Sequence, residues 1–298
     1  MKKPKFNLKE IKQIVENNSG YPFELEIVRR IEMQRDYPYF VEPNYSFEDH
    51  DTGKARELDF HAIQAIPIST RKAEYVFMVI LGCCKDNKNP YIFFTREAPL
   101  SGITLDSDAP IAGCPLELYV DEDTEAIEWH LGFHEFMHIG KADVVSSQFC
   151  ELAPKGSAWH VQSETIFNDA FIPLLKALSR EIEHFNQDLN PKNSTENLPS
   201  YQIHYPLLVL KGPVLEYHLP PKGPAQLRSA KHILVIRHYE SKTVKCRYAI
   251  DVIHESYLEQ YLDLIQIEVN AFANRVKRHK KEIMYSIEKL SEPQKDVK

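Results

Sequence analysis

RELDFHAIQA (Arg56–Ala65) and YVFMVILGCCK (Tyr75–Lys85) are the two stretches that decide the expected fold. The second is apolar almost throughout, which is typical of a central strand buried on both faces. The first alternates polar and apolar residues, which predicts a half-buried strand with Glu57, Asp59 and His61 on one face and Leu58, Phe60 and Ala62 on the other. Together the two stretches predict the centre of a β-sheet.

The residues before these strands predict a hairpin preceded by helices. Asp49–Gly53 has turn composition, and Tyr39–Phe47 reads as a strand interrupted at Pro43. Apolar residues recur every four positions in a helix expected from about Pro22 to Gln34, and Leu8–Asn18 predicts a shorter amphipathic helix.

The residues after Lys85 predict further strands and helices. Tyr91–Thr95 reads as a strand, whereas residues 103–157 show no sustained period. A helix kinked by Pro173 is expected over Ser163–Phe185, followed by a polar linker over residues 186–200. Beyond it we expect strands and a long helix, at Leu207–Leu210, Val214–His218, His232–Tyr239, Cys246–Ile253 and Leu258–Val276.

These segments predict an α/β fold with a mixed central sheet flanked by helices. We expect one domain over residues 1–185 and a C-terminal α+β region over residues 201–290, whose strands extend the same sheet or form their own.

Composition narrows the class of protein. The 298 residues are 43% hydrophobic, enough for a sizeable core, and the apolar runs are too short to span a membrane. Five cysteines without a CxxC pair, and no export signal after the basic N-terminus, favour a soluble protein of the reducing cytoplasm. The net charge of −7 argues against a protein that coats nucleic acid, but it leaves room for a local basic groove.

The order of elements and motifs resembles the core of the PD-(D/E)XK, or restriction-endonuclease-like, nucleases. The resemblance lies in Gly20–Glu24 opening a helix, Arg56–Phe60 on a strand, and Cys84-Lys85 closing the next strand, with the Ser163–Phe185 helix completing the core. It covers about residues 20–97. It implies a restriction-endonuclease-like fold and Mg²⁺-dependent hydrolysis of nucleic acid, with DNA as the expected substrate.

The resemblance also implies roles for individual residues. Asp59 would bind Mg²⁺, Lys85 would orient or deprotonate the attacking water, and Glu24 would be the helical acid, with Glu26 as the alternative. Glu57 shares the expected strand face of Asp59 and is a further candidate metal ligand, and His61 would line the same pocket.

Cys83 departs from the family pattern, because Glu-x-Lys would place a glutamate there. A thiol is a soft ligand and a poor substitute for a carboxylate on Mg²⁺. Two alternatives therefore stay open: an active nuclease whose metal site is completed by Glu24 or Glu57, and a degenerate nuclease fold that binds nucleic acid or serves as a scaffold.

A competing motif is His134-Glu135-Phe136-Met137-His138, which matches the HExxH pattern of zinc metallopeptidases. Its third ligand would be Glu164 or Glu151, and neither spacing is a family match. Gly132 and Gly140 flank the motif, so structural histidines are the simpler interpretation.

Two clusters of basic residues are further candidate binding sites, one at Arg275–Lys281 and one at Arg29-Arg30. Phosphate contact is one interpretation of each, and a solvated helix face is the other. Neither the preferred nucleic acid nor the oligomeric state follows from the sequence.

Overall fold

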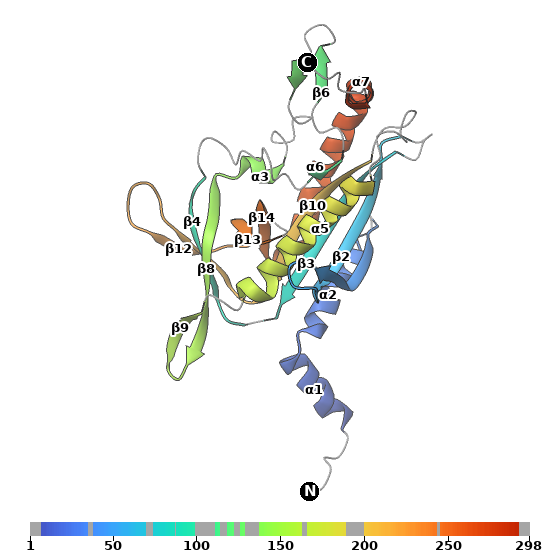
Figure 1. Cartoon of the computed structure of the whole chain (residues 1–298). Coiled ribbons are helices and arrows are strands. Elements are labelled where there is room, and N and C mark those ends of the chain that lie inside the picture. The colour runs from blue at the N-terminus through green and yellow to red at the C-terminus, as the bar shows by residue number, and fades with distance from the viewer. Residues whose placement is uncertain are drawn as a thin grey trace.

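A large mixed β-sheet flanked by helices organises the protein, as the fold class expected from the sequence requires (Figure 1). The structure is a computed structural model and describes residues 7–34, 38–69, 74–86, 88–98, 111–113, 118–121, 126–128, 137–162, 166–188, 200–242 and 245–291.

The sheet contains 12 strands. They are β1 (Phe40–Asp49), β2 (Lys54–Pro67), β3 (Tyr75–Lys85), β4 (Tyr91–Glu97), β5 (Ile111–Ala112), β8 (Val144–Lys155), β9 (Ala158–Gln162), β10 (Tyr201–Leu210), β11 (Val214–His218), β12 (Gln226–Ser229), β13 (His232–Glu240) and β14 (Lys245–His254). Strands β6 (Leu118–Asp121) and β7 (Ala126–Glu128) form a separate pair.

The helices are α1 (Leu8–Asn18), α2 (Tyr21–Glu32), α3 (His138–Lys141), α5 (Ile172–Asp188), α6 (Leu258–Arg278) and α7 (Lys280–Ser291), with a π-helical turn η2 (Phe167–Phe171) and a 3₁₀ turn η4 (Glu255–Tyr257). None of the described helices is long and apolar enough to cross a membrane.

Strand order interleaves the two ends of the chain. Strands β1, β2 and β3 form an antiparallel meander, and β10 runs parallel to β3 on one side and to β14 on the other. Strand β13 follows β14, and a single bridge between Val235 and Ser146 joins β13 to β8, after which come β4, β11 and β12. Residues 1–185 and 201–290 therefore contribute strands to one sheet.

Helices cover both faces of the central strands (Figure 1). Helices α2 and α6 pack on one face, where their apolar residues join Phe60, Ala62 and Met78 in one core cluster. Helix α5 packs on the other face, where Leu174 and Leu178 join Leu81 and Cys83 in a second cluster. Burial on both faces explains why β3 is almost wholly apolar.

Strand β2 corrects one expectation from the sequence. Strict alternation placed Leu58 on the same face as Phe60 and Ala62, but Leu58 belongs to the α5-side cluster and the other two to the opposite cluster. The change of face occurs at Asp59. Opposite it on β1, Asn44 has a positive φ of 54°, and the paired positions run from Pro43–Phe60 to Tyr45–Leu58.

Two proline positions show why local rules were only partly predictive. Strand β1 continues through Pro43, contrary to the expected interruption, because β1 ends the sheet order and an edge strand tolerates a missing N–H. Pro173 lies inside the continuous helical segment 166–188, directly after the π-helical turn η2, and such a local widening of the helix accompanies the residue without an N–H.

Candidate functional site

Asp59 lies where β2 and β3 stop pairing. Their ladder runs from Pro67–Tyr75 to Phe60–Gly82, and beyond it the Asp59 carboxylate accepts a hydrogen bond of 2.5 Å from the backbone N–H of Cys84. Gly82 is needed at this point, because a Cβ there would lie 1.9 Å from Cζ of Phe60. The Phe60 ring therefore lies against the β3 backbone at Gly82. Beyond this point the side-chain hydrogen bond of Asp59 replaces the backbone ladder between the two strands.

Glu24 and Lys85 lie within electrostatic reach of this carboxylate. Burial, followed by the charges of Asp59 and Glu57, raises the pKa of Glu24 to about 7, while Lys85 opposes the rise. Burial also raises the pKa of Asp59, with Glu57 in the same direction and the Cys84 N–H and Lys85 in the other. We call Glu24, Glu57, Asp59 and Lys85 the Asp59 site: three mutually repelling carboxylates and one lysine.

Cys83 is not a hard ligand of this site. Its side chain belongs to the α5-side core cluster and is 3% exposed, and its thiol lies 4.0 Å from the carbonyl oxygen of Ala170 in η2. Burial, followed by the charge of Asp59, raises the pKa of the Cys83 thiol far above its ordinary value. The neutral thiol therefore fills apolar space beneath α5.

The end of β10 adds a residue that sequence reasoning missed. Leu210 pairs with Lys85, so the next residue, Lys211, donates its backbone N–H to the Lys85 carbonyl at 3.2 Å. The Lys211 ammonium lies 3.1 Å from Asp86 and 5.1 Å from the centre of the Phe23 ring on α2. Parallel pairing across more than a hundred residues brings Lys211 here, and no local pattern predicts such pairing.

Several other candidates lie elsewhere. Glu26 is exposed on α2. His61 is buried beside Tyr45, with 4.6 Å between ring centres, and the charge of Glu181 on α5 acts on it, so it belongs to the α5 side of the sheet. Glu151 accepts a hydrogen bond of 2.8 Å from Asn89.

The basic clusters hold structural contacts. Arg30 donates to both carboxylate oxygens of Glu259 at 2.8 Å and to the Glu255 carbonyl at 2.7 Å, which ties α2 to the start of α6. Lys280 lies 3.2 Å from the buried carboxylate of Glu74. A phosphate role for these two side chains would compete with these ion pairs.

The HExxH pattern is only partly described. His134, Glu135 and Glu164 lie outside the described residues. Helix α3 begins at His138, and Met137 before it has extended backbone (φ −75°, ψ 139°). The pattern requires both histidines on one continuous helical turn, and the backbone at Met137 departs from that geometry.

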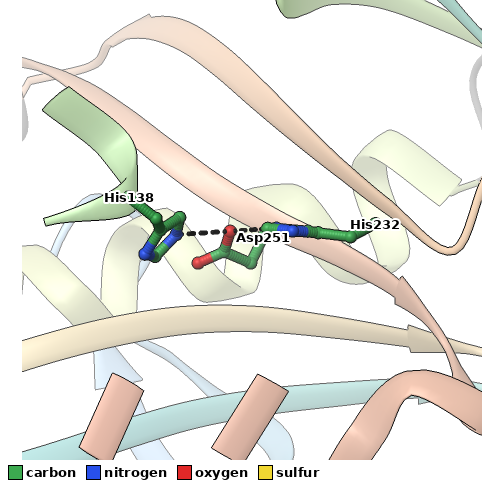
Figure 2. Close-up of side chains that lie close together, drawn as sticks. All are labelled: His138, His232 and Asp251. Carbon is green, nitrogen blue, oxygen red and sulfur yellow. Dashed lines mark hydrogen bonds and ion pairs between the residues drawn. The ribbon is translucent and has the colours of Figure 1, made fainter. Parts of the chain in front are cut away.

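His138 instead meets two residues from the C-terminal strands (Figure 2). Its Nε2 atom lies 2.9 Å from Oδ1 of Asp251 on β14, and Nε2 of His232 on β13 lies 2.7 Å from the same oxygen. One potential ligand atom from each side chain lies within 4.8 Å of the other two. We call these three residues the histidine cluster.

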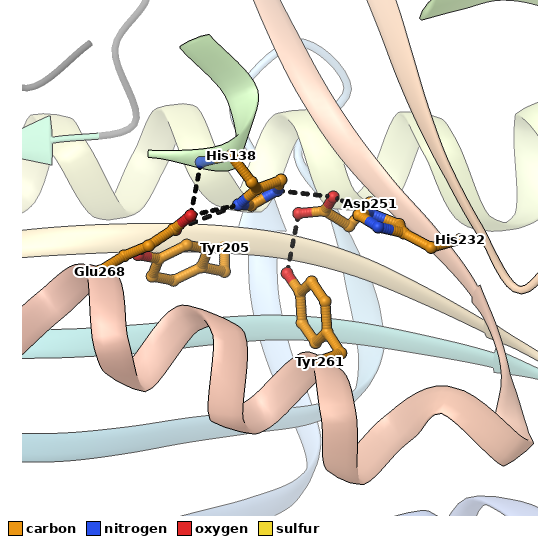
Figure 3. A network of polar contacts seen from close by, with 6 residues as sticks. All are labelled: His138, Tyr205, His232, Asp251, Tyr261 and Glu268. Atoms are coloured by element: carbon orange, nitrogen blue, oxygen red, sulfur yellow. Dashed lines mark hydrogen bonds and ion pairs between the residues drawn. The ribbon is translucent and has the colours of Figure 1, made fainter. Parts of the chain in front are cut away.

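A second layer of polar residues surrounds the histidine cluster (Figure 3). Glu268 on α6 lies 2.9 Å from Nδ1 of His138 and accepts a hydrogen bond from its backbone N–H. Tyr261 donates to Oδ2 of Asp251 at 2.8 Å, and Tyr205 donates to Glu268 at 3.2 Å. Although burial alone would lower it, Asp251 and Glu268 raise the pKa of His138 to about 10.

Comparison with family models, with curated proteins and with solved structures found no match for this chain.

Proposed function

We propose that this chain is a nuclease-fold protein of the PD-(D/E)XK type that binds Mg²⁺ and hydrolyses phosphodiester bonds of nucleic acid, with DNA as the first substrate to test. The observation that carries the proposal is the Asp59 site, where Asp59 from β2 raises and Lys85 from β3 lowers the pKa of Glu24 on α2, and where the Asp59 carboxylate accepts a hydrogen bond from the Cys84 N–H beside Lys85. The succession of α2, three meander strands and α5 on the opposite face supports the same assignment.

The charges of the Asp59 site favour a divalent cation. Three carboxylates face a single lysine, and the elevated pKa of Glu24 reflects that imbalance as well as burial. Mg²⁺ takes hard oxygen ligands and is commonly held by one or two carboxylates with waters. Asp59 and Glu24 would hold the ion, Glu57 would support it, and Lys85 would orient the water that attacks phosphorus.

A second candidate is a nuclease fold that binds nucleic acid without cutting it. The buried, neutral thiol of Cys83 favours this alternative, because it supplies no carboxylate at a position where the family has one. The two candidates differ in whether Glu24 and Glu57 compensate for that loss.

Cleavage assays on the purified full-length protein test the proposal. Supercoiled DNA and single-stranded RNA are incubated with Mg²⁺ or Mn²⁺, and Mg²⁺ binding is measured by calorimetry. We expect metal-dependent cleavage that falls by about 100-fold or more, roughly 2.7 kcal/mol of barrier, in Asp59→Ala and Glu24→Ala. Glu26→Ala is the matched control, since Glu26 is an exposed acid on the same helix.

The Cys83→Glu variant separates the two candidates. Cleavage by the unmodified protein excludes the degenerate fold, whereas nucleic-acid binding without cleavage, with cleavage gained in Cys83→Glu, supports it. Because Cys83 is buried, circular dichroism must first show that the variant folds. If the unmodified protein neither binds metal nor binds nor cuts nucleic acid, both candidates are wrong.

A further inference from the structure

The histidine cluster joins three elements that are distant in sequence. His138 comes from α3, His232 from β13 and Asp251 from β14, and the Asp251 side chain is only 1% exposed. Its two histidines are partly open, with side-chain exposures of 12% for His138 and 22% for His232. The cluster thus has a closed, carboxylate side and a side that solvent reaches.

Two buried carboxylates lie against His138. Asp251 and Glu268 are both buried, and both meet His138. Within the described part of the chain, the ion-pair partners of these two carboxylates are His138 and His232. A divalent cation bound by neutral histidines would offset the charge of these two buried carboxylates.

The orientation of the residues is that of a ligand set. In metal sites the histidine nitrogen that does not bind the ion donates to a carboxylate, which fixes the ring and increases its basicity. Glu268 occupies that position at Nδ1 of His138, and Tyr261 holds the second oxygen of Asp251 in the same way. Nε2 of His138, Nε2 of His232 and Oδ1 of Asp251 therefore face one another.

We propose that His138, His232 and Asp251 bind one divalent transition-metal ion, Zn²⁺ by their ligand chemistry. Two imidazoles and a carboxylate suit Zn²⁺, and three protein ligands leave a fourth position for water or substrate on the solvent-facing side. Metal–ligand distances of about 2.0–2.1 Å require ligand atoms about 3.4 Å apart in a tetrahedron, so the present contacts must lengthen by about 0.5–0.7 Å. Because an imidazole nitrogen binds a metal ion only when it carries no proton, binding would release any proton held on these ligand nitrogens.

This zinc site is separate from the proposed Mg²⁺ site. It shares no residue with the Asp59 site, and its ligand set contains two imidazole nitrogens, whereas the Asp59 site offers carboxylate oxygens. The strand register places Asp251 opposite Leu207 and Leu207 opposite Gly82, so the two sites lie on strands separated by β10. Failure of nuclease activity would leave the zinc proposal intact, and the reverse also holds.

Metal analysis of the full-length protein is the first test. The protein is stripped with EDTA, incubated with ZnCl₂, desalted and assayed for bound zinc, and Co²⁺ is added in parallel for its visible absorption. We expect one equivalent of zinc and the intense visible bands of tetrahedral Co²⁺. Less than a tenth of an equivalent of zinc, or octahedral Co²⁺ only, overturns the proposal.

Variants assign the ligands. His232→Ala, at the partly exposed ligand, should weaken Zn²⁺ by more than 100-fold, and Glu268→Gln should weaken it by about 10- to 100-fold as a second-layer change. His160→Ala, at an exposed histidine of β9, should leave Zn²⁺ binding unchanged. Folding is checked by circular dichroism. Zinc retained at full affinity in a folded His232→Ala variant places the ion elsewhere and overturns the assignment.

Discussion

At the scale of single residues, Glu24 reports most directly on the Asp59 site. Burial and the neighbouring charges of Asp59 and Glu57 raise its pKa from the ordinary 4.5 to about 7. A carboxyl group with a raised pKa binds more protons in the folded than in the unfolded protein between those two values. Its contribution to stability is therefore fully present below about pH 4.5 and is lost as the pH rises through about 7.

Glu24→Gln should remove this pH dependence. We expect the free energy of unfolding of the variant, relative to the unmodified protein, to increase as the pH rises from 4.5 to 7.5, because the amide never ionises. Urea denaturation at several pH values measures the difference. Adding Mg²⁺ should reduce it, since a bound cation favours the ionised Glu24.

The exposed neighbour provides the control for this prediction. Glu26→Gln on the same helix should show no comparable trend with pH. A flat difference between Glu24→Gln and the unmodified protein from pH 4.5 to 7.5 would contradict the placement of Glu24 beside Asp59 and Glu57.

At the scale of elements, the β1–β2 hairpin is fastened to α5 by a buried ion pair. The Lys176 ammonium on α5 lies 2.5 Å from Asp49 at the end of β1 and 3.0 Å from Asp51 in the turn, and Arg56 lies 2.6 Å from Asp49. Burial by itself would raise the pKa of Asp49, but the hydrogen bonds from Lys176 and Arg56 hold it well below its usual range. The hairpin carries Asp59, so this contact helps to position the site.

Lys176→Met should destabilise the protein by about 3 kcal/mol. Removing one partner of a buried pair costs roughly 3–5 kcal/mol, and the remaining Arg56 contact places the expectation at the low end. Urea denaturation at pH 7 measures this change in the free energy of unfolding. Lys12→Met on the exposed face of α1 should stay within about 0.5 kcal/mol, and an equally small effect of Lys176→Met would show that Asp49 does not need this partner.

Element prediction succeeded where a period was sustained over many residues. The helix expected over Leu8–Asn18 was confirmed at both ends, as was the strand over Val214–His218. The long helix expected over Leu258–Val276 was confirmed as α6. Strand β8 was missed because residues 103–157 show no sustained period, and pairing with β4 stabilises β8 without requiring one. Strand β9, which directly follows that region and pairs with β8, was not predicted either.

At the scale of the whole molecule, folding depends on residues far apart in the chain. All ten residues of β10 pair with β3, from Tyr201 opposite Val76 to Leu210 opposite Lys85, and α6 covers the same face of the sheet as α2. Residues 1–190 alone would therefore expose a buried strand edge and the α2-side core.

A fragment of residues 1–190 should consequently lack a cooperative unfolding transition, whereas the full chain should unfold in one step. Thermal denaturation followed by circular dichroism tests both statements. Co-expression with residues 191–298 should restore a complex that purifies together and melts cooperatively. A fragment that folds and melts cooperatively by itself would show that the N-terminal half is an independent domain.

The sequence alone determined the α/β fold class, the central strand β3 and the candidates Glu24, Asp59 and Lys85, because local periodicity and motif order are properties of neighbouring residues. Whether those candidates act as predicted is left to the cleavage and metal-binding assays. Only the tertiary structure decided that Leu58 and Phe60 face opposite sides of the sheet, that Lys211 adjoins Lys85, and that His138 meets His232 and Asp251. These relations arise from strand pairing and helix packing between distant segments. A local sequence pattern does not identify which distant segment will pair or pack with it.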